Sequence, residues 1–117
     1  MQVSQSRHCQ RDMTNSFFRN PEVGNVVQFT RIMERCVVEA PIWENIRTYR
    51  DGRIFGGDGK LSHIHANDTF LILERMADPS EAAFWYKILF EEGVWWLHWW
   101  DQDAYGRESF AKLEVIS

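Results

Sequence analysis

The chain is poor in cysteine and proline, and it has no long apolar run. Its two cysteines, Cys9 and Cys36, lie in stretches of different character, and residues 1–20 contain no apolar segment of the kind that leads a secreted protein. We therefore expect reduced thiols in a cytoplasmic protein rather than a disulfide scaffold. No apolar stretch approaches the roughly 20 residues of a membrane-spanning helix, so we expect no membrane partner.

The chain also lacks the motifs of common catalytic and cofactor-binding sites. No serine lies in a G-x-S-x-G turn, and the glycine-rich GGDGK (Gly56–Lys60) does not have the spacing of a phosphate loop. The paired carboxylates Glu91–Glu92 and Asp101–Asp103 belong to a turn and a loop, whereas glycosidases need two carboxylates across a cleft. We predict a protein with no catalytic residues and no cofactor, which is not an enzyme.

Histidines are too few to predict a metal site. His63 and His65 would share one face of an extended strand, and Asp58 or Asp68 would add an oxygen. Zinc takes three or four ligands, and the sequence offers no cysteine pair and no further histidine at a recognised spacing. His98 would have to come from a distant strand. We therefore predict no metal site in this chain and no stoichiometric zinc in the purified protein.

Negative charge predominates outside the first residues. Residues 1–20 carry three arginines against one aspartate and sum to +2, whereas residues 21–117 carry ten Lys/Arg against sixteen Asp/Glu and sum to −6. An acidic body disfavours binding to phosphate backbones. We do not expect nucleic acid as a general partner.

Aromatic residues, in contrast, are abundant, at 15% of 117 residues. Four of the six tryptophans lie in EEGVWWLHWW (Glu91–Trp100). If residues 94–100 form a strand, Trp95, Leu97 and Trp99 face one side, and the other side carries Val94, Trp96, His98 and Trp100. A small barrel has one interior, so the second side must be covered by residues 1–20, by residues 41–66 or by a partner.

Most of the remaining pattern is typical of strands. The β-branched residues 26–40 indicate one long strand or a bent pair that ends at Pro41. Asp51-Gly52 favours a tight hairpin turn, and the following glycines predict a mobile loop over 56–59. Residues 68–76 resemble a strand buried on both faces. Residues 84–100 predict two strands around Glu91-Glu92-Gly93, and residues 109–117 a closing strand.

One stretch favours a different element. Asp78 is a candidate N-cap, Pro79 stands at the first helical position, Glu81 follows three residues after the cap, and Gly93 stands where a C-terminal glycine belongs. This signature predicts a helix over 79–92 and an α+β fold. Against it, FWYKILF is apolar all round and rich in aromatics, which lose rotamer freedom in a helix. We prefer the hairpin and keep the helix as the alternative.

The order of pieces in the last 55 residues resembles the Src-homology-3-like small barrels. NDTFLILE (Asn67–Glu74), WYKILFEEG (Trp85–Gly93), VWWLHW and AKLEVI are similar to four successive pieces of that family. Residues 41–66 would occupy the family's long first loop. The resemblance implies a mainly β fold, a small barrel of five to six strands over 21–117, after an irregular tail over 1–20.

The resemblance does not extend to the members that bind proline-rich peptides. The chain has no ALYDY-type stretch, and Tyr105 lacks the accompanying proline. It is more similar to bacterial and bacteriophage barrels that serve as docking modules. This implies a small accessory or structural protein, located in the cytoplasm or, if encoded by a bacteriophage, in the host cytoplasm or virion.

These observations together predict a non-catalytic protein-interaction or assembly module. Its partner would be another protein or a second copy of the chain, and the contact residues would be Trp96, Trp100, His98 and Trp43. The alternative is binding of single-stranded nucleic acid through the tryptophan-rich strand.

Overall fold

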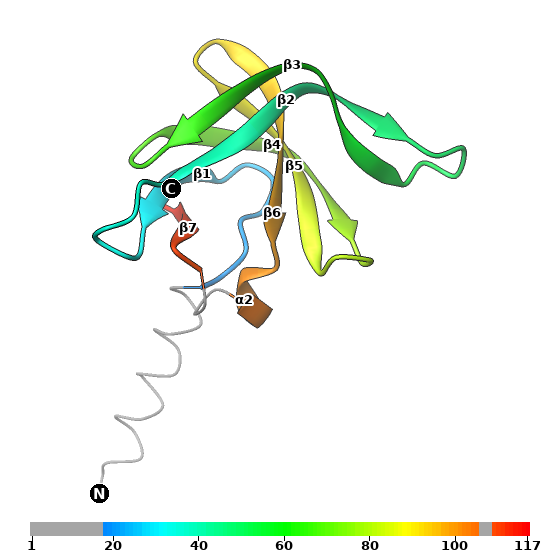
Figure 1. Ribbon diagram of the computed structural model, residues 1–117. Coiled ribbons are helices and arrows are strands. Elements are labelled where there is room, and N and C mark those ends of the chain that lie inside the picture. Colours follow the sequence, from blue (N-terminus) through cyan, green and yellow to red (C-terminus); the bar gives the residue numbers. More distant parts are fainter. Residues whose placement is uncertain (1–17, 106–108) are drawn as a thin grey trace, which may run out of the picture.

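The computed structural model describes residues 18–105 and 109–117, which form one antiparallel sheet of seven strands (Figure 1). The strands are β1 (Val26–Arg31), β2 (Glu39–Thr48), β3 (Ile54–His65), β4 (Thr69–Asp78), β5 (Ala83–Phe90), β6 (Gly93–Trp100) and β7 (Ala111–Val115). Their order across the sheet is β3-β2-β6-β5-β4-β1-β7. A short helix, α2 (Gln102–Tyr105), lies between β6 and β7. The predicted mainly β fold is therefore confirmed.

All seven strands contribute to one hydrophobic core. Its fully buried members include Val27 and Phe29 of β1, Ile42 of β2, Ile64 of β3, Ile72 of β4, Ile88 of β5, Leu97 of β6 and Leu113 of β7. A flat sheet could not bring its outermost strands into one cluster, so the sheet curls around this core (Figure 1). The edge strands β3 and β7 do not pair with each other. The prediction of a five-to-six-stranded barrel is therefore wrong in its strand number, and the sheet is not closed.

The tryptophan-rich strand pairs with its neighbour through a two-residue turn. Glu91 and Glu92 join β5 to β6 with backbone φ angles of 49° and 64°, as a type I′ turn requires. The pairing continues from Phe90↔Gly93 to Ala83↔Trp100. The two strands predicted for residues 84–100 are confirmed.

The alternative helix over 79–92 is wrong, because the residues expected to cap its start form the turn between β4 and β5 instead. Asp78 accepts a hydrogen bond from the Ser80 hydroxyl at 2.7 Å, and its carbonyl oxygen accepts one from the Glu81 amide at 3.2 Å. Ala82 then has a positive φ of 50°, which ends any helical course. The apolar residues that follow alternate between the two faces of the sheet as β5, whose outer face is covered at Trp85 but exposed at Leu89.

The stretch predicted as a long first loop is a hairpin of two long strands. β2 and β3 pair from Glu39↔His65 to Thr48↔Ile54, and the hairpin projects from the sheet (Figure 1). Its turn contains the predicted Asp51-Gly52, and Gly52 has a φ of 90°. Gly56 to Gly59 lie inside β3 rather than in a mobile loop.

The segment predicted as one long strand or a bent pair over residues 26–40 contains β1 and only the first two residues of β2. β1 ends at Arg31, and β2 begins at Glu39 and runs through Pro41 instead of ending there. β2 pairs with β6 only at Ile42 and Trp43. Pro41 therefore interrupts no ladder on that side of β2, which is the setting in which strands tolerate proline.

Residues 1–17, most of the predicted tail, lie outside the described residues. The next residues are packed against the sheet: the Asn20 side chain donates to Asp101 at 2.9 Å and accepts from the Gln102 amide at 2.7 Å. The buried Gln102 side chain in turn bonds to Leu113, Trp99 and the Arg19 carbonyl. This network fixes the position of α2 against β6 and β7.

Candidate functional site

Aromatic side chains form a second, smaller layer on the outer face of the sheet. Trp85 of β5 lies between Trp43 and His98, with ring centroids 5.8 Å and 4.5 Å away. Trp96 stands opposite Trp43 where β2 pairs with β6. These neighbours leave only 5% of Trp85 exposed, although its side chain points away from the main core. The β2–β3 hairpin therefore provides part of the cover that the outer face needs.

A glycine makes this cover possible. Gly57 of β3 lies directly beneath the Trp43 ring, and a Cβ atom at position 57 would overlap that ring. The ladder between β2 and β3 changes register between Trp43 and Asn45. The irregular, glycine-containing strand thus lets Trp43 lie flat against its own hairpin and on Trp85.

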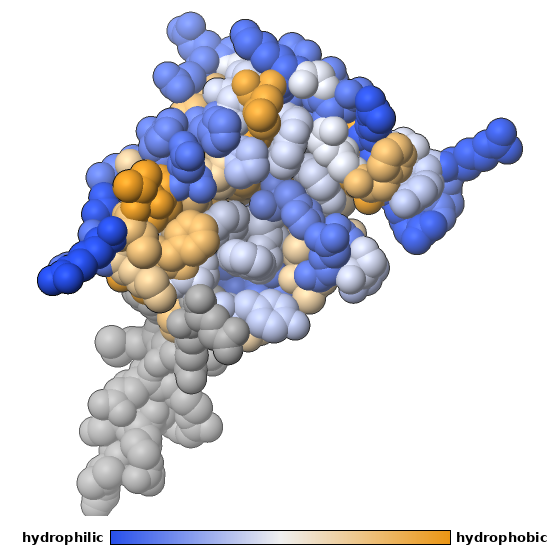
Figure 2. Space-filling model, viewed as in Figure 1, coloured by the Kyte–Doolittle hydropathy of each residue, from blue (hydrophilic) through white to orange (hydrophobic). Residues whose placement is uncertain are grey.

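One pocket lies between the end of the β2–β3 hairpin and the turn that joins β4 to β5. It has a volume of about 300 Å³ and is lined by Tyr49, Arg53, Ile54, Phe55, Ala77, Asp78, Pro79, Ser80, Glu81 and Trp85. Tyr49 and Phe55 are in contact, with ring centroids 4.8 Å apart, and each is 51% exposed. Figure 2 shows that the projecting end of the hairpin is hydrophilic, with hydrophobic atoms immediately behind it.

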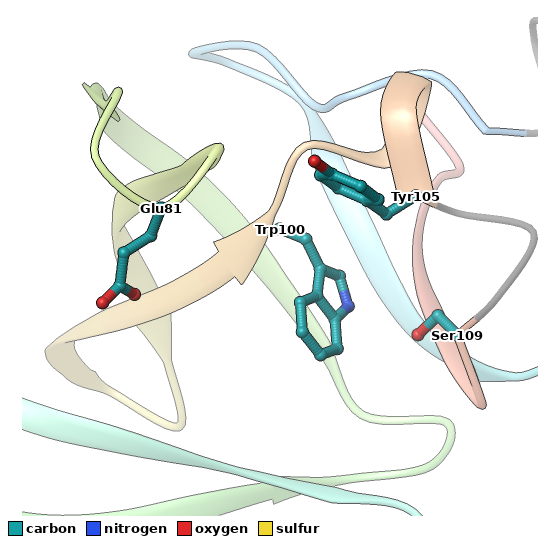
Figure 3. A pocket seen from close by; sticks show the side chains of 4 residues that line it. All are labelled: Glu81, Trp100, Tyr105 and Ser109. Atoms are coloured by element: carbon teal, nitrogen blue, oxygen red, sulfur yellow. The ribbon is translucent and has the colours of Figure 1, made fainter.

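A second pocket, of about 360 Å³, adjoins the first. Glu81, Trp100, Tyr105 and Ser109 line it, and the Trp100 indole stands between Glu81 and the other two side chains (Figure 3). Trp100 is 43% exposed and Tyr105 46%. Glu81 lines both pockets, and we call the two neighbouring pockets together the aromatic groove. It runs from Tyr49 and Phe55 to Trp100 and Tyr105.

A histidine and two carboxylates lie close together beside the two pockets. His98 Nε2 lies 3.0 Å from Asp78 Oδ2 and 3.8 Å from Glu81 Oε2. Partial burial acts to raise the pKa of Asp78, but hydrogen bonds from Ser80 and His98 outweigh it and lower that pKa. Asp78 is therefore held as a carboxylate at neutral pH.

The floor of the groove contains a buried hydrogen-bond donor without an acceptor. The indole N–H of Trp85 is buried and has no hydrogen-bond partner. It faces the Asp78 carboxylate closely enough to help lower its pKa, but it makes no hydrogen bond of ordinary geometry. Native proteins rarely leave such a donor unsatisfied, so this atom marks a place where an acceptor is expected.

Of the four predicted contact residues, only one lines the groove. Trp100 lines the groove, whereas Trp43, Trp96 and His98 are half-buried on the same outer face. The predicted facing of β6 is confirmed for Leu97 and Trp99, which are buried, and for the exposed Val94 and Trp100.

The histidines weighed as metal ligands lie elsewhere. His63 and His65 are both exposed on β3. Asp68 is near His65, with 3.9 Å between Oδ2 and Nδ1, but Asp58 pairs with Arg47 at 3.4 Å. The structure therefore does not gather the four residues into one site.

Sequence reasoning missed most of the groove. Tyr49, Phe55 and Tyr105 lie on three different elements, and nothing in their spacing predicts that they flank one groove. Asp78 and Glu81 entered the sequence analysis only as the start signal of the alternative helix over 79–92. The one available signal was the aromatic-rich strand pair itself, which stands beside a turn rich in carboxylates.

No family model, curated protein or solved structure matches this chain. In the part of the chain that the structure describes, no helix has the length and apolar character needed to cross a membrane. Any function must therefore be argued from the groove itself.

Proposed function

We propose that this chain is a non-catalytic protein-interaction module that binds an extended segment of a partner protein in the aromatic groove. The observation that carries the proposal is the groove's composition: four exposed aromatic side chains at its two ends and a buried N–H donor on its floor. Exposed clusters of large aromatic side chains are typical of interfaces, where tyrosine and tryptophan supply most of the binding energy.

The chemistry of the groove favours a polypeptide. A backbone carbonyl of an extended segment is an acceptor of the kind that the Trp85 N–H lacks. Asp78 and Glu81 at the centre of the groove would attract a basic side chain and repel a phosphate backbone. The carboxylates argue against single-stranded nucleic acid, the alternative suggested by the tryptophan-rich strand.

We further propose that the fold belongs to the Src-homology-3-like type. In support, β4, β5, β6 and β7 correspond to the four pieces whose sequences resemble that family. The β2–β3 hairpin occupies the place of the long first loop, between β1 and β4. The open edges of the sheet leave this assignment a proposal, and the function argued above depends on the groove alone. A bacterial or bacteriophage accessory protein is the class that this resemblance supports.

The proposal is tested by selecting binders from a library of random unstructured peptides against the full chain. We expect selected peptides to shift the indole N–H resonance of Trp85 in NMR spectra, because that proton gains an acceptor. Trp100→Ala and Tyr105→Ala should each weaken binding by about tenfold or more, a typical effect at an interface hot spot. Leu61→Ala is the matched control, since Leu61 is 53% exposed on β3 and does not line either pocket.

Two results would count against the proposal. The first is a failure to select any peptide whose binding depends on Trp100 or Tyr105. The second is a selected peptide that leaves the Trp85 indole resonance unchanged and loses affinity with Leu61→Ala. If light scattering instead shows a dimer that Trp100→Ala dissociates, the partner is a second copy of the chain.

A further inference from the structure

We propose that Asp78, Glu81 and His98 form a binding site for a divalent transition-metal ion such as Zn²⁺. One donor atom from each residue lies within 4.8 Å of the other two. Zinc binds nitrogen and oxygen ligands at about 2.1 Å, so ligand atoms in a tetrahedral site lie roughly 3.4 Å apart. The distances of 3.0 Å and 3.8 Å from His98 Nε2 to the two carboxylates bracket this value. This inference shares the buried Trp85 N–H with the proposed function, but it is tested without a peptide.

The backbone holds the three residues in place. His98 projects from the outer face of β6, and Asp78 ends β4 where it pairs with Ala83 of β5. Glu81 lies in the tight turn that its own amide closes on the Asp78 carbonyl. The Glu81 side chain is 66% exposed, so it can move the short distance needed to complete the coordination. Two ligands are thus fixed and the third is adjustable.

The Trp85 N–H is buried beside Asp78 without a hydrogen bond of ordinary geometry, and it is a second sign of a ligand at this place. Trp85 is 95% buried, its ring lies 4.5 Å from that of His98, and its N–H faces Asp78. Residues that bind metals are themselves held by hydrogen bonds from a surrounding shell. A water molecule on the ion, or an Asp78 oxygen that turns as it binds, would supply the acceptor that this N–H lacks.

A second trio in the same protein shows why the geometry is selective. His65 also lies near two carboxylates, Glu39 at 3.3 Å and Asp68 at 3.9 Å. These contacts use Nε2 and Nδ1 respectively, which lie on opposite sides of the imidazole ring, so one ion cannot bridge them. Among the described residues, the group at His98 is the one whose donor atoms converge.

The donor set selects the class of ion. An imidazole nitrogen with two carboxylate oxygens suits Zn²⁺, Co²⁺ or Ni²⁺, whereas Mg²⁺ and Ca²⁺ prefer all-oxygen sites. Three protein ligands leave a coordination position open toward the groove. A water molecule or an electron-pair donor of a bound partner would fill it.

The test is calorimetric titration of the chelator-treated full chain with zinc chloride, with magnesium chloride as the hard-ion control. We expect one zinc equivalent that depends on His98, and no saturable magnesium binding. His98→Gln should weaken this binding at least tenfold and Glu81→Gln severalfold. His65→Gln, which alters the trio of similar composition, should leave it unchanged. Zinc should raise the melting temperature of the wild type and of His65→Gln but not of His98→Gln.

Glu81→Gln keeps the test decisive if His98→Gln fails to fold, because the exposed Glu81 side chain contributes little to stability. The proposal is overturned if no zinc binding is saturable, if His65→Gln lowers affinity as much as His98→Gln, or if a folded His98→Gln and Glu81→Gln both bind like the wild type. Loss of zinc binding with intact peptide binding would leave the proposed function standing.

Discussion

Two buried polar side chains, Gln102 and Tyr86, differ in whether they have hydrogen-bond partners. Gln102 is 1% exposed, and its side chain accepts from the Leu113 amide and the Trp99 indole and donates to the Leu113 and Arg19 carbonyls. The Tyr86 hydroxyl is also fully buried but has no partner. The first side chain organises α2, whereas the second costs stability, because an unsatisfied buried polar atom costs about 1–3 kcal/mol.

Tyr86→Phe should therefore stabilise the protein by about 1 kcal/mol. The substitution removes only the unpaired hydroxyl and keeps the ring in the core. The free energy of unfolding from urea titration is the measurement, and Tyr105→Phe at an exposed site is the control. A loss of more than 1 kcal/mol would mean that the hydroxyl has a partner in solution.

The same residue gives the protein a dependence on alkaline pH. Burial raises the pKa of Tyr86 above its usual value of 10.0, so the folded state keeps a proton that the unfolded state releases. Stability from this group is complete below pH 10 and falls as the pH rises toward the folded pKa. The advantage of Tyr86→Phe should therefore grow above pH 10, by up to about 1.4 kcal/mol per pH unit. An advantage that stays constant from pH 8 to 11 would refute this.

At the scale of the element, β6 separates structural from surface tryptophans by simple alternation. Trp99 is buried, packs edge-on against Phe29 at 5.3 Å, and donates to Gln102. Trp100, the next residue, is largely exposed in the groove. Two adjacent residues of the same type should therefore respond differently to the same substitution.

Trp99→Ala should cost about 3–5 kcal/mol, the usual range for a large core aromatic. Trp100→Ala should cost less than about 1 kcal/mol and leave a folded protein, because its side chain is already in contact with solvent. Chemical denaturation of both variants gives the comparison. If both unfold alike, the whole cluster is core, and the groove loses its main contact residue.

β3 contains a second pair of adjacent identical residues, Gly56 and Gly57, that should respond differently to substitution. Gly57→Ala should force Trp43 off the hairpin and expose Trp85, at a cost of about 1–3 kcal/mol. Gly56→Ala is the matched control, since a Cβ atom there meets nothing within 4 Å. We expect a red shift of tryptophan fluorescence for Gly57→Ala and none for Gly56→Ala. Equal effects would show that strand propensity rather than the Trp43 contact governs both positions.

The elements that the sequence predicted well are those whose signal is local. β4 to β7 are rich in apolar residues, and Glu91-Glu92-Gly93 forms a turn between two aromatic runs that do not favour a helix. The β2–β3 hairpin was only half recognised, because Gly56, Gly57 and Gly59 are typical of loops. Their use in a strand depends on Trp43, a contact between positions fourteen residues apart.

The candidate site was harder to predict than the fold for the same reason. Trp100 was identified from its place in a tryptophan-rich strand. The convergence of Asp78, Glu81 and His98 depends on the register of β5 against β4 and β6 and on the turn that carries Glu81, and the spacing of residues encodes neither. The unsatisfied N–H of Trp85 is a property of packing alone.

At the scale of the whole molecule, charge limits the choice of partner. The chain has a net charge of −4, and the groove carries carboxylates at its centre. A nucleic acid that approaches Trp100 would be repelled through its phosphates by these carboxylates before its bases could stack on the indole. The negative charge of the molecule thus favours protein binding over nucleic-acid binding, the two functions that a tryptophan-rich surface suggests.

We expect weak or absent binding to single-stranded oligonucleotides at physiological salt. Fluorescence anisotropy with a labelled thymidine oligonucleotide is the measurement, repeated at low salt. Tight binding that weakens steeply with salt would indicate several phosphate contacts and would favour the nucleic-acid function over the protein-binding one.

The position of β7 has a consequence for how the molecule is made. β1 pairs with both β4 and β7, and in the second pairing Val27 lies opposite Val115, 88 positions later in the chain. Contacts of such long sequence separation slow the folding of all-β domains to milliseconds or seconds. On the ribosome, β1 emerges early but must wait for nearly the whole chain before its outer edge is covered. The interval between synthesis of β1 and release of β7 is therefore when this protein is most exposed to misassembly.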